Sequence, residues 1–164
     1  MTMKRYDLII IGGGPGGSTA AKVAAEFGAN VLLLEKEEKG RYKCCAGGIP
    51  LKNKEFSPIP RTEHTREITG GVLVTPTKGM MEFDTTRESD KGYCLFRTGF
   101  DKYLLDLAHD AGAEIRYNFR VKEVNPSGNH IIIKGPQEFQ AECVIIATGI
   151  GGAILQRRLG LEVP

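Results

Sequence analysis

The chain has 164 residues, of which 41% are hydrophobic and 26% are charged, and this composition excludes a disordered or collagen-like protein. The 22 Lys and Arg residues nearly balance the 20 Asp and Glu residues, so the net charge of +2 favours no nucleic-acid partner. No apolar run approaches the roughly 20 residues of a membrane-spanning helix. The 4 cysteines lack the spacing of disulfide frameworks or zinc sites, so we expect a cytoplasmic protein without a metal site.

The N-terminal part of the chain predicts a β–α–β unit. Residues 6–11 are β-formers that are apolar at almost every position, as in a parallel strand buried on both faces. A glycine-rich turn over residues 12–17 leads into apolar residues at helical spacing, which end at the C-cap glycine Gly28. A second buried strand covers residues 31–34, and a right-handed crossover makes the two strands parallel neighbours.

The middle of the chain contains a predicted loop, a predicted antiparallel sheet and then a predicted helix. Residues 36–65 are charged and rich in Gly and Pro, which predicts a loop. Residues 66–96 carry short alternating apolar runs, which predict a small antiparallel sheet inserted into the fold. A helix is then expected to begin with Asp101 as its N-cap and to end at Gly112.

The last third of the chain is predicted to consist mainly of strands. They are a short strand, a three-stranded meander and a separate buried strand, at residues 115–117, 119–124, 130–134, 138–141 and 143–147. The first turn of the meander is placed at residues 125–129, which contain Pro and Gly. We expect Cys143 to be a core residue and Cys94 to pack in the inserted sheet, whereas His64, His109 and His130 are expected at the surface.

Together these elements predict an α/β fold. It is a Rossmann-like nucleotide-binding domain with a parallel sheet and a β-meander, plus the small antiparallel β insertion. Residues 1–64 and 100–164 are assigned to the nucleotide-binding domain. Residues 65–99 are assigned to the insertion, which we expect to belong to a substrate-side domain.

The glycine-rich turn fits the pattern G-x-G-x-x-G at Gly12, Gly14 and Gly17. The first glycine permits a tight turn, the second lets the backbone approach a diphosphate, and the third lets the helix pack on the strand. Glu35 ends the second strand about twenty residues further on, where an acid accepts hydrogen bonds from ribose hydroxyls and repels a 2′-phosphate. This pair predicts a dinucleotide with an unphosphorylated adenosine ribose, either FAD or NAD.

The remainder resembles the glutathione-reductase-like FAD proteins, because a helix, a strand and a meander lead to a strand that ends in Ala147-Thr148-Gly149. The resemblance implies that FAD is the cofactor, that Glu35 holds its ribose and that Val121 faces its adenine. The Ala-Thr-Gly turn is expected to close that side of the site. The cofactor-binding residues expected in this part of the site are Gly12, Gly14, Pro15, Gly16, Gly17, Glu35, Lys36, Val121, Ala147, Thr148 and Gly149.

A narrower resemblance lies in residues 43–51, which read KCCAGGIPL and are similar to the KPCGGAIPL-type segment of geranylgeranyl reductases. Cys44 replaces the proline of that segment, and Ala46 and Gly48 exchange small residues. Residues 97–101 and 111–113 resemble the R-x-x-F-D and AGA segments of the same family. The resemblance implies that Cys45, Ala46, Gly47 and Arg97 lie near the flavin, with Cys45 as the one candidate for the catalytic site; the alternative for Cys45 is an ordinary loop thiol.

Geranylgeranyl reductases saturate isoprenoid double bonds, so the resemblance implies hydride transfer from reduced flavin to a prenylated lipid, pigment or quinone, with an external electron donor. Peripheral contact with a membrane is compatible with such substrates. Proteins of this class carry a later Gly-Asp segment and a substrate domain, so the chain is expected to be the N-terminal part of a longer flavoprotein, inactive alone and completed by further chain or by a second chain. Two alternatives stay open: an FAD-dependent aromatic hydroxylase-type monooxygenase, and a non-catalytic nucleotide-binding fragment.

Overall fold

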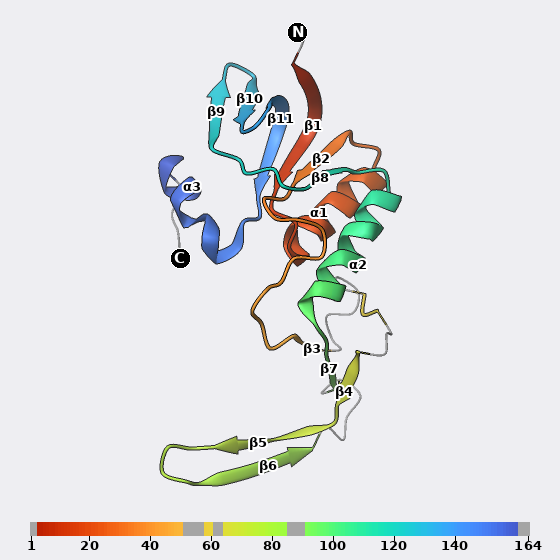
Figure 1. The fold of residues 1–164 in the computed structure, drawn as a ribbon, viewed down its shortest axis with the longest axis vertical. Helices are drawn as coiled ribbons and strands as arrows, with labels where there is room; N and C mark the ends of the chain where they lie inside the picture. Colours follow the sequence, from red (N-terminus) through yellow and green to blue (C-terminus); the bar gives the residue numbers. More distant parts are fainter. Residues whose placement is uncertain (1–2, 51–57, 61–63, 85–90, 161–164) are drawn as a thin grey trace. The chain divides into compact units, whose positions relative to one another are not determined.

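The computed structural model describes residues 3–50, 58–60, 64–84 and 91–160 (Figure 1). The chain divides into two compact units, which are described separately below. Unit 1 contains Met1–Arg41 and Asp101–Pro164, and unit 2 contains Tyr42–Phe100. The first boundary therefore precedes the one placed at 64/65 from the sequence, whereas the second lies next to the expected 99/100. The assignment of the insertion to a substrate-side domain stays a prediction.

Unit 1 is built on a six-stranded sheet in the order β8-β2-β1-β11-β10-β9 (Figure 1). Its parallel part consists of β8 (Glu114–Arg116), β2 (Val31–Leu34), β1 (Lys4–Ile11) and β11 (Glu138–Ile146). The antiparallel part adds β10 (His130–Lys134) and β9 (Glu123–Ser127). The predicted α/β fold with a parallel sheet and a meander is confirmed. Because β1 lies between β2 and β11, its C-terminal end meets the ends of two neighbouring strands.

Both faces of the sheet are buried at β2 and at the C-terminal end of β1, which explains the continuous apolar runs there. One face packs against α1 (Pro15–Glu26) and α2 (Arg97–Asp110) through a cluster that includes Ile10, Leu33 and Leu105. The opposite face carries a second cluster built from alternate strand residues and three aromatic rings, and it includes Ile9, Leu32, Phe119 and Phe139. Each fully buried Leu or Ile contributes about 1.5–3 kcal/mol to stability.

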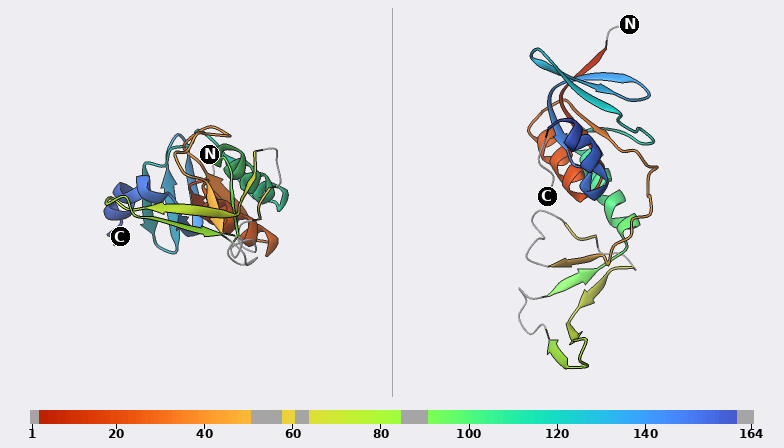
Figure 2. Two further views of the ribbon diagram at one scale, coloured as in Figure 1. Left: turned by 90° about the horizontal axis from the view of Figure 1, so that it is seen from below. Right: turned by 90° about the vertical axis from the view of Figure 1, so that its left-hand side faces the viewer.

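After β11 the chain forms the 3₁₀ turn η3 (Gly149–Gly152) and the short helix α3 (Ala153–Arg158). Leu155 of α3 and Leu159 behind it pack against the cluster of Phe119 and Phe139. Figure 2 shows the same ribbon from two further directions.

Two strand predictions in unit 1 need correction. The strands placed at 138–141 and 143–147 are one continuous strand, β11, because all of it pairs with β1 from Phe139 to Ile146. The first turn of the meander is the two-residue turn Gly128-Asn129 rather than residues 125–129, since Ser127 pairs with His130 and Gly128 has a φ of +58°. A left-handed residue in a two-residue turn matches the twist of the hairpin.

Burial and capping also differ from expectation at three residues. Cys143 is exposed rather than buried, because β10 pairs with β11 through Ala141 and, among the described residues, β11 pairs beyond that point with β1 alone. His130 is half-buried, and its Nδ1 is buried without a hydrogen-bond partner. The helix α2 begins at Arg97, so Asp101 lies inside the helix and is not its N-cap.

Unit 2 contains the predicted antiparallel strands. β3 (Gly48–Pro50), β7 (Gly92–Cys94) and β4 (Arg66–Ile68) form one sheet, and β3 lies in a segment that was expected to be loop only. β5 (Gly70–Val74) and β6 (Met80–Asp84) form a hairpin, seen as a pair in Figures 1 and 2. Cys94 is exposed, although it belongs to the sheet as expected. The residues 51–57 and 61–63 of the predicted loop lie outside the described residues.

Candidate cofactor-binding site

The glycine-rich turn follows β1 directly, and two of its glycines are required by the fold itself. Gly12 has a φ of +110°, and a Cβ there would lie 2.5 Å from the carbonyl oxygen of Ala147. A Cβ on Gly17 would lie 1.9 Å from the carbonyl oxygen of Gly12, because α1 starts pressed against the strand. Any residue with a Cβ at either position would force the neighbouring backbone to move. These two positions therefore set the shape of the turn.

The conformation and surroundings of Gly14 do not require glycine. Its φ of −78° and ψ of −178° are extended values that any residue adopts. The nearest atom to a Cβ at this position is Nη2 of Arg41, at 3.8 Å, which is an ordinary van der Waals distance. A Cβ on Gly16 would have no atom within 4 Å. The open space at Gly14 fits a group that approaches the backbone from outside the chain, as a dinucleotide diphosphate does.

The N-terminus of α1 offers unpaired donors at the same place. Gly14 is the N-cap and Pro15 is the first helical residue, no side chain caps the helix, and its first turn contains no acidic residue. The N–H groups of a first turn have no partner inside the helix, and the helix dipole favours an anion there. The buried Ser18 fixes the turn, since its hydroxyl donates to the carbonyl oxygens of Gly14 and Gly13 at 2.8 and 3.3 Å. The turn therefore has the geometry and the partial positive charge that favour an anion.

Glu35 lies at the C-terminal end of β2 with only 4% of its surface exposed. Its Oε2 accepts a hydrogen bond of 2.7 Å from the N–H of Gly13, and its Oε1 accepts one of 3.0 Å from the N–H of Glu37. The backbone of Glu35 is held as well, because its N–H donates to Arg116 and its carbonyl accepts from Phe119. The carboxylate is thus oriented at the edge of the glycine turn, at the C-terminal end of the parallel strands where such sheets bind nucleotides.

The Ala-Thr-Gly turn lies against the glycine turn. The N–H of Ala147 donates to the carbonyl oxygen of Ile11 at 2.9 Å, and Gly149 has a φ of +61°. The Cβ of Ala147 would be 3.3 Å from a Cβ on Gly17. The hydroxyl oxygen of Thr148 is buried and has no hydrogen-bond partner. The structure therefore brings together two segments about 130 residues apart in the sequence, as in a fold whose first and last parallel strands are neighbours.

Two further predicted residues lie in unit 1. Val121 is partly buried and packs against the core cluster of Phe119 and Phe139. Lys36 follows Glu35 but is exposed, and its Nζ pairs with Glu37 at 3.5 Å. Their contacts with a cofactor stay predictions.

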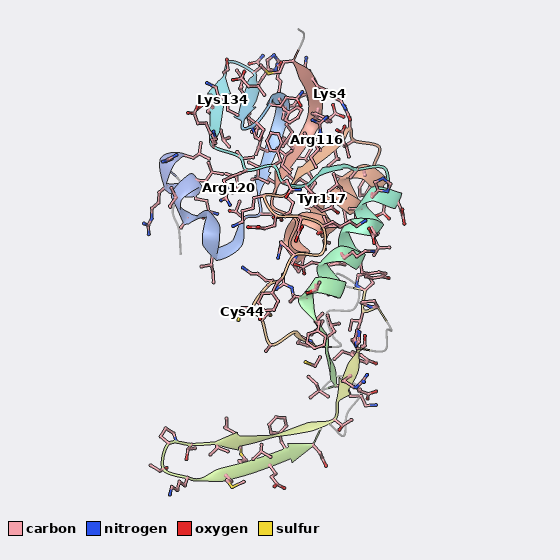
Figure 3. All side chains as sticks on the ribbon, viewed as in Figure 1. Lys4, Cys44, Arg116, Tyr117, Arg120 and Lys134 are labelled. Atoms are coloured by element: carbon pink, nitrogen blue, oxygen red, sulfur yellow. The ribbon has the colours of Figure 1, made fainter. Side chains whose placement is uncertain are left out.

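The predicted flavin-side residues belong to unit 2. Cys45 and Ala46 are exposed; the N–H of Gly47 donates to Sγ of Cys45 at 3.4 Å, and the carbonyl of Ala46 accepts from the thiol of Cys94 at 3.1 Å. Gly47 has a φ of +72°, and a Cβ there would lie 2.0 Å from the carbonyl oxygen of Leu95. Gly47 is therefore required by the approach of β7. Figure 3 labels the neighbouring Cys44 in the extended segment between β2 and β3.

Arg97 is half-buried in the first turn of α2. Its role at the phosphate and ribityl chain of the flavin cofactor stays a prediction.

Sequence reasoning missed a buried ion-pair network beside Glu35. Arg41 lies with its Nε 3.6 Å from Oε2 of Glu35 and its Nη2 3.2 Å from Oδ2 of Asp101. Arg41 stands in a charged loop without periodicity, so no pattern in the sequence distinguishes it from its neighbours. The sequence predicts a helix cap at Asp101, whereas the structure places it inside α2 and pairs it with Arg41.

The edge of the sheet away from this site carries a second network. Glu114 accepts hydrogen bonds from Lys4, from the hydroxyl of Tyr6 at 2.9 Å and from Arg116 at 2.9 Å; Figure 3 labels Lys4 and Arg116. Burial raises the pKa of Glu114, but the bonds from Lys4, Tyr6 and Arg116 outweigh it, so the pKa of this carboxyl is lowered from 4.5. Burial raises the pKa of Tyr6. The glycine turn of residues 12–17, Glu35 and the turn of residues 147–149 together form what we call the glycine-turn site. The groups around Glu114 stabilise the sheet and are not part of that site.

In the described part of the chain, no helix is long and apolar enough to cross a membrane. The same residues contain no group of three or more His, Cys, Asp or Glu side chains that could hold a metal ion.

Comparison with known proteins identifies the family. Residues 7–157 match the family described as FAD dependent oxidoreductase. Digeranylgeranylglycerophospholipid reductase of Methanocaldococcus jannaschii is 35% identical over 149 residues, which cover 88% of this chain and 36% of that protein. Digeranylgeranylglycerophospholipid reductase 2 of Methanothermobacter thermautotrophicus is also 35% identical, over 96% of this chain and 43% of its own length.

Solved structures agree with these relatives. A geranylgeranyl bacteriochlorophyll reductase-like protein from Thermoplasma acidophilum superposes with a TM-score of 0.85 and 28% identity, over 98% of this chain and 43% of that one. The halogenase PltM in complex with phloroglucinol and FAD has a TM-score of 0.77 at 22% identity, over 97% of this chain and 37% of that one, and so shares the fold alone.

The chain thus spans about 40% of the length of the relatives that it matches. The predicted resemblance to the N-terminal part of geranylgeranyl reductases is confirmed, and so are the predictions of FAD as cofactor and of an oxidoreductase. The chain belongs to the FAD dependent oxidoreductase family.

Proposed function

We propose that this chain is the FAD-binding part of an oxidoreductase that reduces isoprenoid double bonds. The observation that carries the proposal is the glycine turn of unit 1, open at Gly14 and flanked by the oriented carboxylate of Glu35 and by Ala147. The names of the relatives support the substrate class, since two of them are digeranylgeranylglycerophospholipid reductases.

In this proposal each part of the glycine-turn site binds one part of the cofactor. The N–H groups at the start of α1 bind the diphosphate next to Gly14, Pro15, Gly16 and Gly17. Glu35 accepts hydrogen bonds from the ribose hydroxyls, and its negative charge disfavours a 2′-phosphate. Val121 and the turn of Ala147, Thr148 and Gly149 line the adenosine side. FAD supplies hydride chemistry when bound: a hydride goes to one alkene carbon and a proton to the other.

The proposed roles in unit 2 concern the flavin end. Cys45, with Ala46 and Gly47, is proposed to line the space beside the flavin ring and the alkene, and Arg97 to bind the cofactor near its phosphate. Lys36 is proposed as a further cofactor contact at the end of β2.

For the whole protein we propose a prenylated lipid substrate, an external electron donor and peripheral contact with a membrane. The relatives are more than twice as long as the matched region, so a longer chain or a second chain is proposed to complete the substrate site. Reduction is tested anaerobically on the completed protein, with a reduced flavin and a geranylgeranyl lipid as substrate. The product should gain two hydrogen atoms per double bond; oxygen-dependent hydroxylation of an aromatic substrate would instead favour the monooxygenase.

The cofactor site is tested by replacing the ribose-binding carboxylate. Glu35→Ala should weaken FAD binding by about 1–3 kcal/mol, the size of a hydrogen bond to a charged group, because the ribose hydroxyls lose their acceptor. Quenching of FAD fluorescence measures the dissociation constant. Glu142→Ala is the control, since Glu142 lies on β11 in an exposed ion pair with Arg5. Equal affinities for the two variants would show that the ribose is not held at Glu35.

A further inference from the structure

Arg41 connects three segments of the glycine-turn site. Its guanidinium lies 3.6 Å from the Glu35 carboxylate and 3.2 Å from the Asp101 carboxylate, measured from Nε and Nη2. Its Nη2 is also the atom nearest to the side-chain position of Gly14, at 3.8 Å. Arg41 therefore pairs with the carboxylate at the end of β2 and with a carboxylate of α2, and it lies beside the turn before α1.

All three charged side chains are largely buried. The side chain of Arg41 is 16% exposed, and those of Glu35 and Asp101 are 5% exposed. Ion pairs at this depth are screened far less than surface pairs, and removing one partner leaves an uncompensated charge. A planar guanidinium also imposes direction, because its donors lie in one plane at fixed angles. Arg41 thus acts on the orientation of Glu35 as well as on its charge.

The atom that Arg41 approaches is the one that bonds the glycine turn. Oε2 of Glu35 accepts from the N–H of Gly13 and lies nearest to Nε of Arg41. Asp101 holds the other end of the guanidinium from inside α2, which is a rigid support. The rotamer of Glu35 is therefore set by Gly13, Glu37 and Arg41 together.

We propose that Arg41 is a positioning residue for recognition of the cofactor's adenosine ribose, acting through Glu35 and held in place by Asp101. The proposal rests on the proposed function, in which Glu35 accepts hydrogen bonds from the ribose. Without Arg41 the carboxylate keeps its hydrogen bonds from Gly13 and Glu37 but loses the ion pair that holds Oε2 from the other side, so its orientation toward the ribose is held less firmly. Asp101 then serves the cofactor site without touching the cofactor.

The test compares FAD with its analogue that carries 2′-deoxyadenosine, using fluorescence quenching to measure both dissociation constants. In the native chain the analogue should bind about tenfold more weakly, the effect of one lost hydrogen bond to a charged group. In Arg41→Gln this ratio should fall below about threefold, because Glu35 loses its ion pair and is held less firmly toward the ribose. Asp101→Asn should lower the ratio partly, and Arg41→Lys should lower it although the charge is kept.

Arg5→Gln is the matched control, because Arg5 belongs to the same unit but pairs with Glu142 at the exposed surface. Its ratio should equal that of the native chain. Equal weakening of both ligands by Arg41→Gln, with the tenfold ratio kept, would overturn the proposal and indicate a general structural or diphosphate role. If Arg41→Gln does not fold, Asp101→Asn and Arg41→Lys decide in the same way. A ratio near one in the native chain would instead refute the ribose role of Glu35, and with it this part of the proposed function.

Discussion

Gly14 provides a substitution that should separate cofactor binding from folding. Its extended backbone accepts alanine, and the added Cβ would meet only Nη2 of Arg41, at 3.8 Å, within 4 Å. Loss of a glycine lowers the entropy of the unfolded chain, which stabilises by about 0.4–1 kcal/mol. Alanine is a poorer N-cap than glycine by a similar amount. We therefore expect the stability of Gly14→Ala to differ from that of the native chain by less than about 1 kcal/mol.

The same methyl group should reduce the affinity for FAD strongly. It projects into the space beside the free N–H groups of α1, so a phosphate oxygen can no longer approach them at hydrogen-bond distance. Losing one hydrogen bond to a charged group costs about 1.5–3 kcal/mol, which corresponds to a roughly 10- to 150-fold weaker dissociation constant. Fluorescence titration with FAD and a thermal unfolding scan measure the two quantities on one sample.

Gly99→Ala is the matched control for Gly14→Ala. Gly99 lies in α2, and a Cβ there would have no atom within 4 Å. This control should leave the affinity for FAD unchanged. Gly14→Ala that binds FAD within threefold of the native chain would refute the argument that Gly14 is kept free for the diphosphate.

Two further predictions concern stability. Gly17→Ala should lower the free energy of unfolding by at least about 1–3 kcal/mol in a denaturant titration, because its Cβ would lie 1.9 Å from the carbonyl oxygen of Gly12; an unchanged unfolding midpoint would show that α1 can shift without loss. The lowered pKa of Glu114 means that this carboxylate stabilises the fold above pH 4.5 and loses the contribution as the pH falls through its folded pKa. Between pH 5 and pH 3, the free energy of unfolding measured with urea should therefore fall less in Glu114→Gln than in the native chain. An equal fall in the two proteins would show that the hydrogen bonds to Glu114 do not stabilise the fold.

The β–α–β unit could be predicted because its signals are local. The second half of β1 and all of β2 are apolar on both faces, and the turn between β1 and α1 contains the glycines that its geometry requires at Gly12 and Gly17. The position of Glu35 follows from the length of β2. Local sequence patterns are therefore enough to predict elements whose structure is determined by residues adjacent in the sequence.

Other features depend on neighbours far away in the sequence. The run from Cys143 predicts a buried strand, but burial depends on whether β10 extends alongside, and β10 ends its pairing at Ala141. Asp101 has the residue type of a helix cap, whereas its position inside α2 and its pairing with Arg41 come from tertiary packing. No spacing rule connects Arg41 to Asp101, so the network beside Glu35 is visible only in three dimensions.

The close contacts among Gly12, Gly17 and Ala147 have a consequence for how fast the cofactor associates. These backbones meet at distances that leave no room for a methyl group, so the turn already has a single shape in the absence of nucleotide. Ordering one residue costs about 1–2 kcal/mol, and here that entropy is lost during folding rather than at the binding event. In the proposed cofactor site, we therefore expect the encounter of protein and FAD, rather than a slow rearrangement of the loop, to limit the rate of binding.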